Sequence, residues 1–165
     1  MLTPSSVRSI EPPVATYPVI STEELAKHIR ICGQEGVTSR LDVKLPGNAG
    51  PPWSLFFRQG RLAWSASEVH PLRRWNRQLF QFCPNLITGS FSQGKTRPQY
   101  WDYDSLTELV RQRKIEQKQL AAIFAGNSME ILFDIIQIGQ QLLPSSDLQL
   151  VYRKLPQGII DSTSI

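Results

Sequence analysis

Apolar residues alternate with polar ones on either side of a Gln59-Gly60 dipeptide, a pattern typical of a β-hairpin. With a two-residue loop, apolar side chains would share one face of the hairpin in the pairs Phe57–Leu62, Leu55–Trp64 and Trp53–Ala66. A three-residue loop would pair Phe57 with Arg61 and mix the faces, so the register favours the tight turn, with Gly60 at positive φ.

The tip of this hairpin, Arg58, Gly60 and Arg61, is a candidate contact site. The register sets Arg58 opposite Arg61, and like charges in that position are mildly unfavourable. Either an acidic group approaches the tip, or the two long side chains splay into water.

The chain before the hairpin predicts a helix followed by a strand. Ser21 is a candidate N-cap with Glu24 three residues on, and Leu25, Ile29 and Cys32 share one face of the helix. From Val37 to Leu45 the residues that point to one side of a strand alternate strictly with those that point to the other, which predicts a half-buried strand with a solvent-exposed back. The residues expected on that back are Thr38, Arg40, Asp42 and Lys44.

After the hairpin the pattern turns helical. Pro71 is expected in the first turn of a helix, and Asp104 is expected to cap a second one. A third helical run is expected to end at Gly126, where Asn127 would cap a fourth helix with Glu130 three residues on. Alternation resumes over 148–155 and predicts a final strand.

These elements predict an α+β fold, a small antiparallel sheet packed by helices, with a helical insert over about 68–127 between the hairpin and the last helix–strand unit. Residues 1–19 are rich in proline, serine and threonine and are expected to be a flexible leader. The domain is expected over 20–156, with a linker at 157–165.

Composition restricts the kinds of partner and the compartment expected for this domain. The chain has 165 residues and a net charge of +4, with 18 basic and 14 acidic residues. This balance permits an acidic partner without requiring nucleic acid. Its two cysteines form no CxxC motif, and we find neither a secretion signal nor an apolar run of membrane-span length. We therefore expect a cytoplasmic protein that is not inserted in a membrane.

Catalytic and metal-binding patterns are missing from the sequence. It contains no GxSxG, HExxH or P-loop motif, and neither His28 nor His70 lies at helical spacing from another histidine or cysteine. Asp102 and Asp104 fit helix capping better than acid–base chemistry. We expect no enzyme activity, no metal and no cofactor.

The best candidate surface is basic and aromatic. Arg73, Arg74 and Arg77 surround Trp75 on one predicted helix, and arginine pairs bidentately with carboxylates on acidic proteins. Tyr100, Trp101 and Tyr103 could form an aromatic anchor beside them. The alternatives are a solvated helix face with Trp75 in the core, and aromatic residues that pack the insert onto the sheet.

Several stretches together resemble the PATAN domain, the N-terminal domain of cyanobacterial response regulators of the PatA and PixG type. The resemblance covers about residues 20–155, and the insert motifs Arg73-Arg74-Trp75 and Tyr100–Tyr103 take part in it. Its other stretches are Thr22–Leu25, the strand ending in Lys44, Leu55–Trp64 and Met129–Gln137. The turn departs from the pattern, since many relatives carry Asp or Asn where this chain has Gln59.

The resemblance implies an output domain of a two-component response regulator that controls type IV pilus motility and phototaxis. It also implies a protein partner, either the pilus extension ATPase or another signalling protein, and a receiver domain in cis that this sequence does not contain. A homodimer is compatible with the predicted sheet and insert. The alternative is a regulatory module that binds nucleic acid or a nucleotide, but acidic residues spread through the basic segment argue against nucleic acid.

Overall fold

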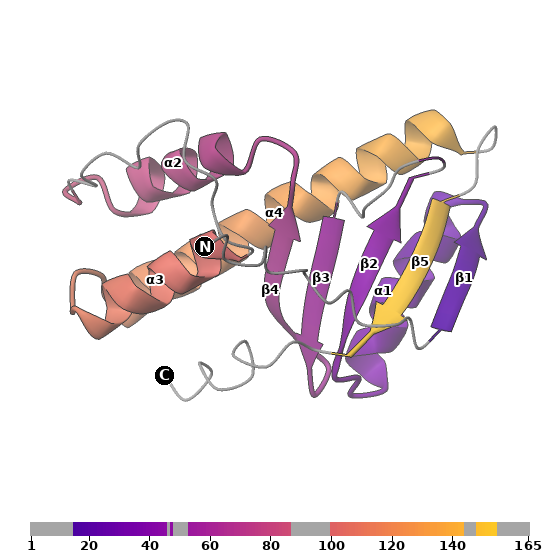
Figure 1. Ribbon diagram of the computed structural model, residues 1–165, viewed down its shortest axis with the longest axis horizontal. Coiled ribbons are helices and arrows are strands. Elements are labelled where there is room, and N and C mark those ends of the chain that lie inside the picture. The colour runs from indigo at the N-terminus through magenta and orange to yellow at the C-terminus, as the bar shows by residue number, and fades with distance from the viewer. Residues whose placement is uncertain (1–14, 46, 48–52, 87–99, 144–147, 155–165) are drawn as a thin grey trace, which may run out of the picture.

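The protein is described here by a computed structural model, in which residues 15–45, 47, 53–86, 100–143 and 148–154 are placed. The fold is α+β, as predicted: helices pack on an antiparallel sheet with strand order β1-β5-β2-β3-β4 (Figure 1). The strands are β1 (Ala15–Val19), β2 (Ser39–Lys44), β3 (Trp53–Arg58), β4 (Arg61–Ser67) and β5 (Leu148–Arg153). The helices are α1 (Thr22–Gln34), α2 (Pro71–Phe82), α3 (Trp101–Arg111) and α4 (Gln117–Leu142).

The N-terminal part of the domain follows the sequence pattern closely. Ser21 Oγ accepts a hydrogen bond from the Glu24 backbone N–H at 3.1 Å, which confirms the predicted cap of α1. Leu25 and Cys32 are buried, as expected for one apolar face. Residues 15–19, which the sequence placed in a leader, instead form β1 and pair with β5 at the edge of the sheet.

The hairpin has the predicted turn but a different register. Gln59 and Gly60 both have positive φ, 49° and 76°, and Phe57 pairs with Leu62 as predicted. Ala63 is then an extra residue in β4, a β-bulge, so the next pairs are Phe56–Trp64, Leu55–Ser65, Ser54–Ala66 and Trp53–Ser67. The predicted pairs Leu55–Trp64 and Trp53–Ala66 are therefore wrong, and Trp64 lies on the face opposite Leu55.

With this bulge, the hairpin contributes side chains to two hydrophobic cores. In the first core, Leu55 and Phe57 pack with α1 and the C-terminal half of α4. In the second core, Phe56 and Trp64 pack with α2, α3 and the N-terminal half of α4. Figure 1 shows how one helix reaches both cores: α4 passes behind the sheet and continues past β4, where α2 and α3 lie.

The helical segment begins and ends at different residues from those predicted. α3 starts at Trp101, so Asp104 lies inside its first turn and does not cap it. α4 runs without a break through Gly126 and Asn127, and its capping box is formed by Glu116 and Gln119. The predicted end at Gly126 and cap at Asn127 are wrong, because Asn127 bonds to neighbouring elements rather than to its own helix.

α4 is the one helix among the described residues that is long and apolar enough to cross a membrane by length and composition alone. The expectation that no apolar stretch reaches the length of a membrane span does not hold for this helix. In the fold, however, Ile131 and Ile135 of α4 are fully buried in the first core, and Asn127 and Glu130 bind α2. These contacts pack one face of α4 against the sheet and α2, while much of the rest of the helix is exposed.

Candidate interaction surface

Arg74 is a buried residue of α2, not part of an exposed basic patch. Its Nε donates to Asn127 Oδ1 at 2.8 Å, Nη1 to the Val69 carbonyl at 3.1 Å and Nη2 to the Ser67 carbonyl at 3.2 Å. Burial lowers the pKa of this guanidinium, while the charge of Asp102 acts in the opposite direction. Arg74 therefore fixes α2 against the end of β4, and the prediction that it binds a partner is corrected.

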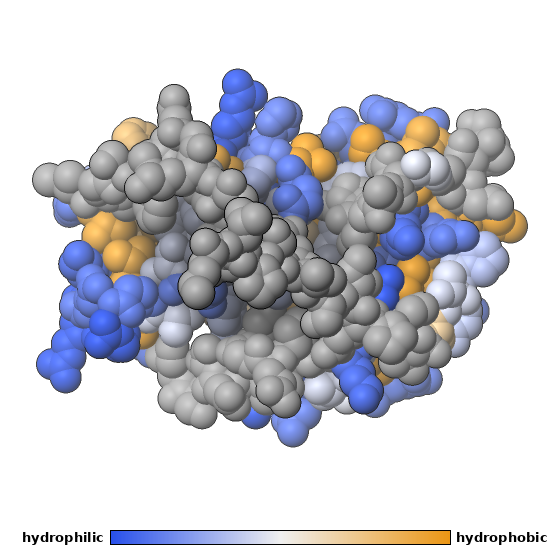
Figure 2. Space-filling view, viewed as in Figure 1, coloured by the Kyte–Doolittle hydropathy of each residue, from blue (hydrophilic) through white to orange (hydrophobic). Residues whose placement is uncertain are grey.

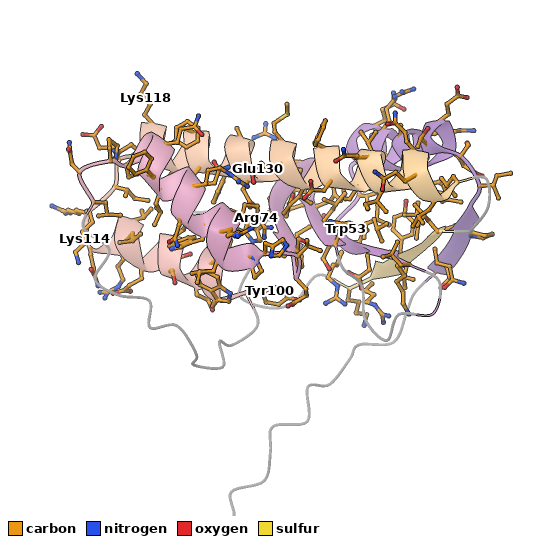
Figure 3. All side chains as sticks on the ribbon, turned by 90° about the horizontal axis from the view of Figure 1, so that it is seen from above. Trp53, Arg74, Tyr100, Lys114, Lys118 and Glu130 are labelled. Atoms are coloured by element: carbon orange, nitrogen blue, oxygen red, sulfur yellow. The ribbon has the colours of Figure 1, made fainter. Side chains whose placement is uncertain are left out.

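Asn127 completes this buried polar junction from α4. Its Nδ2 donates to the Ser65 carbonyl at 2.7 Å while its Oδ1 accepts from Arg74, so a single amide joins α4 to both β4 and α2. Figure 3 shows Arg74 between α2 and the sheet. Sequence reasoning missed this role, because an asparagine before an apolar run has the pattern of a helix cap.

Arg77 is at the surface but its charge is matched. Its Nε and Nη2 each lie 2.8 Å from a different carboxylate oxygen of Glu130, and Gln78 Nε2 donates to the same carboxylate at 2.9 Å. This bidentate pair raises the pKa of Arg77 and sets the orientation of its guanidinium. The Arg77 side chain remains 60% exposed.

The aromatic residues of the predicted patch are packed inside the helical part of the domain. Trp75 and Tyr103 are buried, and Trp75 meets Trp101 edge to face with ring centroids 5.4 Å apart. Tyr100 is half-buried and meets Phe56 of β3 edge to face at 5.3 Å. The expectation of an exposed aromatic anchor is corrected: these rings pack the helical insert onto the sheet.

The hairpin tip is held against the end of α1. Gly60 N–H donates to the Val37 carbonyl at 2.9 Å, and Gln59 N–H donates to Thr38 Oγ1 at 2.8 Å. Arg58 and Arg61 pair across the turn as predicted, with Arg61 exposed. These two bonds attach the tip to the segment between α1 and β2.

The back of β2 carries a buried charge network where the sequence predicted a wet face. Asp42 is fully buried and accepts from Arg40 Nη2 at 2.8 Å, Arg153 Nε at 2.9 Å and Ser54 Oγ at 2.7 Å. Arg40 Nη1 also donates to Tyr100 Oη at 3.0 Å, which ties the sheet to the start of α3. The prediction that this face is exposed to solvent is wrong at Asp42, because side chains from β2, β3 and β5 pair there.

A second polar cluster lies between β1, α1 and β5. Tyr152 Oη lies 3.5 Å from both Cys32 Sγ and His28 Nδ1. Burial raises the pKa of Cys32 and of Tyr152, which keeps both groups protonated at neutral pH and disfavours a reactive thiolate. Among the described residues no group of three or more His, Cys, Asp or Glu could hold a metal ion.

Within the placed residues, two exposed helix rows are the candidate contact surfaces. The first is the outer row of α2, Arg73, Asn76, Arg77 and Phe80, here called the α2 ridge; Phe80 is 81% exposed. The second is an apolar row on α4, Met129, Phe133 and Ile136, here called the α4 stripe. On the face shown in Figure 2, the described apolar residues form separate small areas between hydrophilic ones.

No protein-family model, curated protein or solved structure matches this chain significantly.

Proposed function

We propose that this chain is a non-catalytic protein-interaction domain that binds its partner through the α2 ridge. The carrying observation is Phe80, a large aromatic side chain 81% exposed on the same helix row as Arg73 and Arg77. Aromatic and arginine side chains are enriched at protein interfaces, where they often supply much of the binding energy. Like the site expected from the sequence, the ridge is rich in arginine. It includes Phe80, whereas Arg74 and Trp75 of the expected site are buried.

The geometry of the ridge defines the chemistry of the partner. Arg73 offers an exposed cation, and Arg77 offers the free edge of a guanidinium already oriented by Glu130. Preorganisation lowers the side-chain entropy lost on binding. The matching partner surface has an apolar pocket for Phe80 with carboxylates beside it.

The resemblance to PATAN domains supports placing this domain in signalling. We propose that it is the output domain of a cytoplasmic two-component response regulator, with a receiver domain in cis, that acts on type IV pilus motility and phototaxis. The proposed partner is the pilus extension ATPase or another signalling protein. Phosphate binding, as in the nucleotide or nucleic-acid alternative, has less support because Arg74, one of the three arginines expected in the basic patch, is buried.

The test is titration calorimetry of the purified domain against the purified pilus extension ATPase of the source organism. Phe80→Ser and Arg73→Glu are each expected to weaken binding at least about tenfold, the effect of a modest hot-spot residue. Gln81→Ser, at an exposed neighbouring position of α2, is the matched control and is expected to bind like wild type. Equal binding by all variants, or no binding by wild type, would refute this ridge-and-partner assignment. A nucleotide that raises the melting temperature in a parallel screen would favour the alternative.

A further inference from the structure

The sheet carries a charged face on the side away from α1 and α4. Leu41, Val43 and Leu150 point from β2 and β5 into the first core, so the residues that alternate with them point to the other side. We call this side the charged face; its members are Arg40, Asp42, Ser54, Val151 and Arg153. Figure 1 looks onto it, with α1 and α4 behind the sheet and α2 and α3 past β4. Among the placed residues, no helix lies over β2 and β5 on this side.

The charged face is nevertheless buried over part of β5 and β2. Val151 is 3% exposed, Arg153 7% and Asp42 0%. Gln149, on the same face of β5 but toward its other end, is exposed. Tyr100 reaches this face from the β3 side, whereas β5 lies on the other side of β2. The burial of β5 side chains therefore calls for a cover from a part of the chain outside the placed residues.

The charges on this face indicate what the cover must bring. Arg40 Nη2 and Arg153 Nε both donate to Asp42 Oδ2, at 2.8 Å and 2.9 Å, so these bonds join two guanidinium groups to one carboxylate. The two arginine side chains are only 13% and 9% exposed, and Arg40 Nε is buried with no hydrogen-bond partner. A buried surplus charge is costly unless it is matched, so an acidic group is expected in the cover.

Few acidic residues are available for this role. Outside the placed residues the sequence has three, Glu11, Asp147 and Asp161. Asp147 directly precedes β5 and so lies at the opposite end of that strand from Arg153. The segment 87–99 has no acidic residue, and its Lys95 and Arg97 would add to the surplus. The choice is therefore between the N-terminal segment, 1–14, and the C-terminal segment, 155–165.

We propose that the N-terminal segment crosses the charged face and that the Glu11 carboxylate matches the charge of Arg40 and Arg153. The register favours this segment, because Ala15 pairs with the residue next to Arg153, at the end of β5 where Arg153 pairs with Arg40. Glu11 precedes Ala15 by four residues, or about 12 Å of the extended backbone that Pro12 and Pro13 favour. From β1 to β2 is two strand spacings, about 10 Å, so the carboxylate can reach the pair.

This contact gives the N-terminal segment a regulatory role within the domain. While it covers the charged face, it competes with any acidic ligand for the two arginines, whose guanidinium groups are suited to carboxylates. Displacing the segment would open that face to such a ligand. The α2 ridge lies on another element, so this proposal stands apart from the proposed partner contact.

Phenylglyoxal labelling of the full chain, read at each arginine by mass spectrometry, tests the proposal. In wild type, Arg40 and Arg153 are expected to react at least about tenfold more slowly than the exposed arginines. Glu11→Lys places a like charge beside the pair and is expected to remove most of this protection. Asp161→Lys, the matched control in the C-terminal segment, is expected to keep it. Arg74, buried in the second core, should stay slow in every variant, which shows that the fold is intact.

A double-mutant cycle in urea unfolding gives a second measurement. Glu11→Gln is expected to raise the equilibrium constant of unfolding about fivefold, but less than about twofold when Arg40→Gln is already present. The proposal is overturned if Glu11→Lys leaves the labelling of Arg40 and Arg153 unchanged, if Arg74 loses protection equally, or if the cycle shows no coupling. Protection lost in Asp161→Lys but kept in Glu11→Lys would assign the charged face to the C-terminal segment instead.

Discussion

Replacing Asn127 with alanine is expected to destabilise the fold strongly, although the residue lies in the interior of a helix that favours alanine. The change removes the 2.8 Å bond from Arg74 Nε and the 2.7 Å bond to the Ser65 carbonyl. Each lost hydrogen bond costs about 1 kcal/mol net, more for a charged donor, and each group left buried without a partner costs about 1–3 kcal/mol. The expected loss is about 3–5 kcal/mol, a large share of the ~5–15 kcal/mol of a typical domain.

Urea unfolding followed by circular dichroism measures this loss as a lower midpoint at an unchanged slope. Asn76→Ala is the matched control: Asn76 is exposed on α2, so the same chemical change is expected to stay within about 0.5 kcal/mol. Asn127→Ser separates the junction from a helix cap. A cap tolerates serine as well as asparagine, whereas serine is too short to keep both bonds of the junction.

The role of Asn127 as a buried junction is refuted if Asn127→Ala loses no more stability than Asn76→Ala. It is also refuted if Asn127→Ser unfolds like wild type, since that result would match the cap predicted from the sequence.

Two further changes test other parts of the fold. Gly60→Ala is expected to lower the free energy of unfolding in urea by about 2 kcal/mol more than Gly47→Ala. Both glycines have φ near +76°, but only at Gly60 would an added Cβ lie 2.5 Å from the Gly33 carbonyl oxygen. Equal losses of stability in the two variants would contradict this close approach. Burial raises the pKa of Asp102 in the folded state above its ordinary value of 3.8, so the charged carboxylate is disfavoured in the fold. The free energy of unfolding therefore falls as pH rises from the ordinary pKa through the raised one. Asp102→Asn is therefore expected to gain stability relative to wild type as pH rises above about 4, and a pH-independent difference in unfolding midpoint would contradict this.

The fold class was predictable because its signals are local. Ser21 with Glu24 marks the start of α1, Pro71 lies in the first turn of α2, and the Gln59-Gly60 turn and β5 also follow from short stretches of sequence. Each depends on residues a few positions apart, and the structure confirms them.

The errors share a different cause. Asp42 and Asn127 are polar residues whose partners lie far away in the sequence, such as Arg153 and Arg74. A pattern read along the chain assigns such residues to solvent or to caps, because it contains no information about what folds against them. The candidate site changed for the same reason: Arg74 has the sequence pattern of a surface cation, while Phe80, the most exposed large apolar side chain described, was not singled out.

The single extra residue Ala63 has a consequence for how the domain unfolds. Phe57 and Phe56 are adjacent on one strand, yet they belong to different cores, and the bulge lets β4 supply Leu62 to one core and Trp64 to the other. Neither core can lose its part of the hairpin without straining its neighbour, and α4 is shared in the same way. The helical insert is therefore expected to melt together with the sheet in one cooperative transition rather than as a separable subdomain.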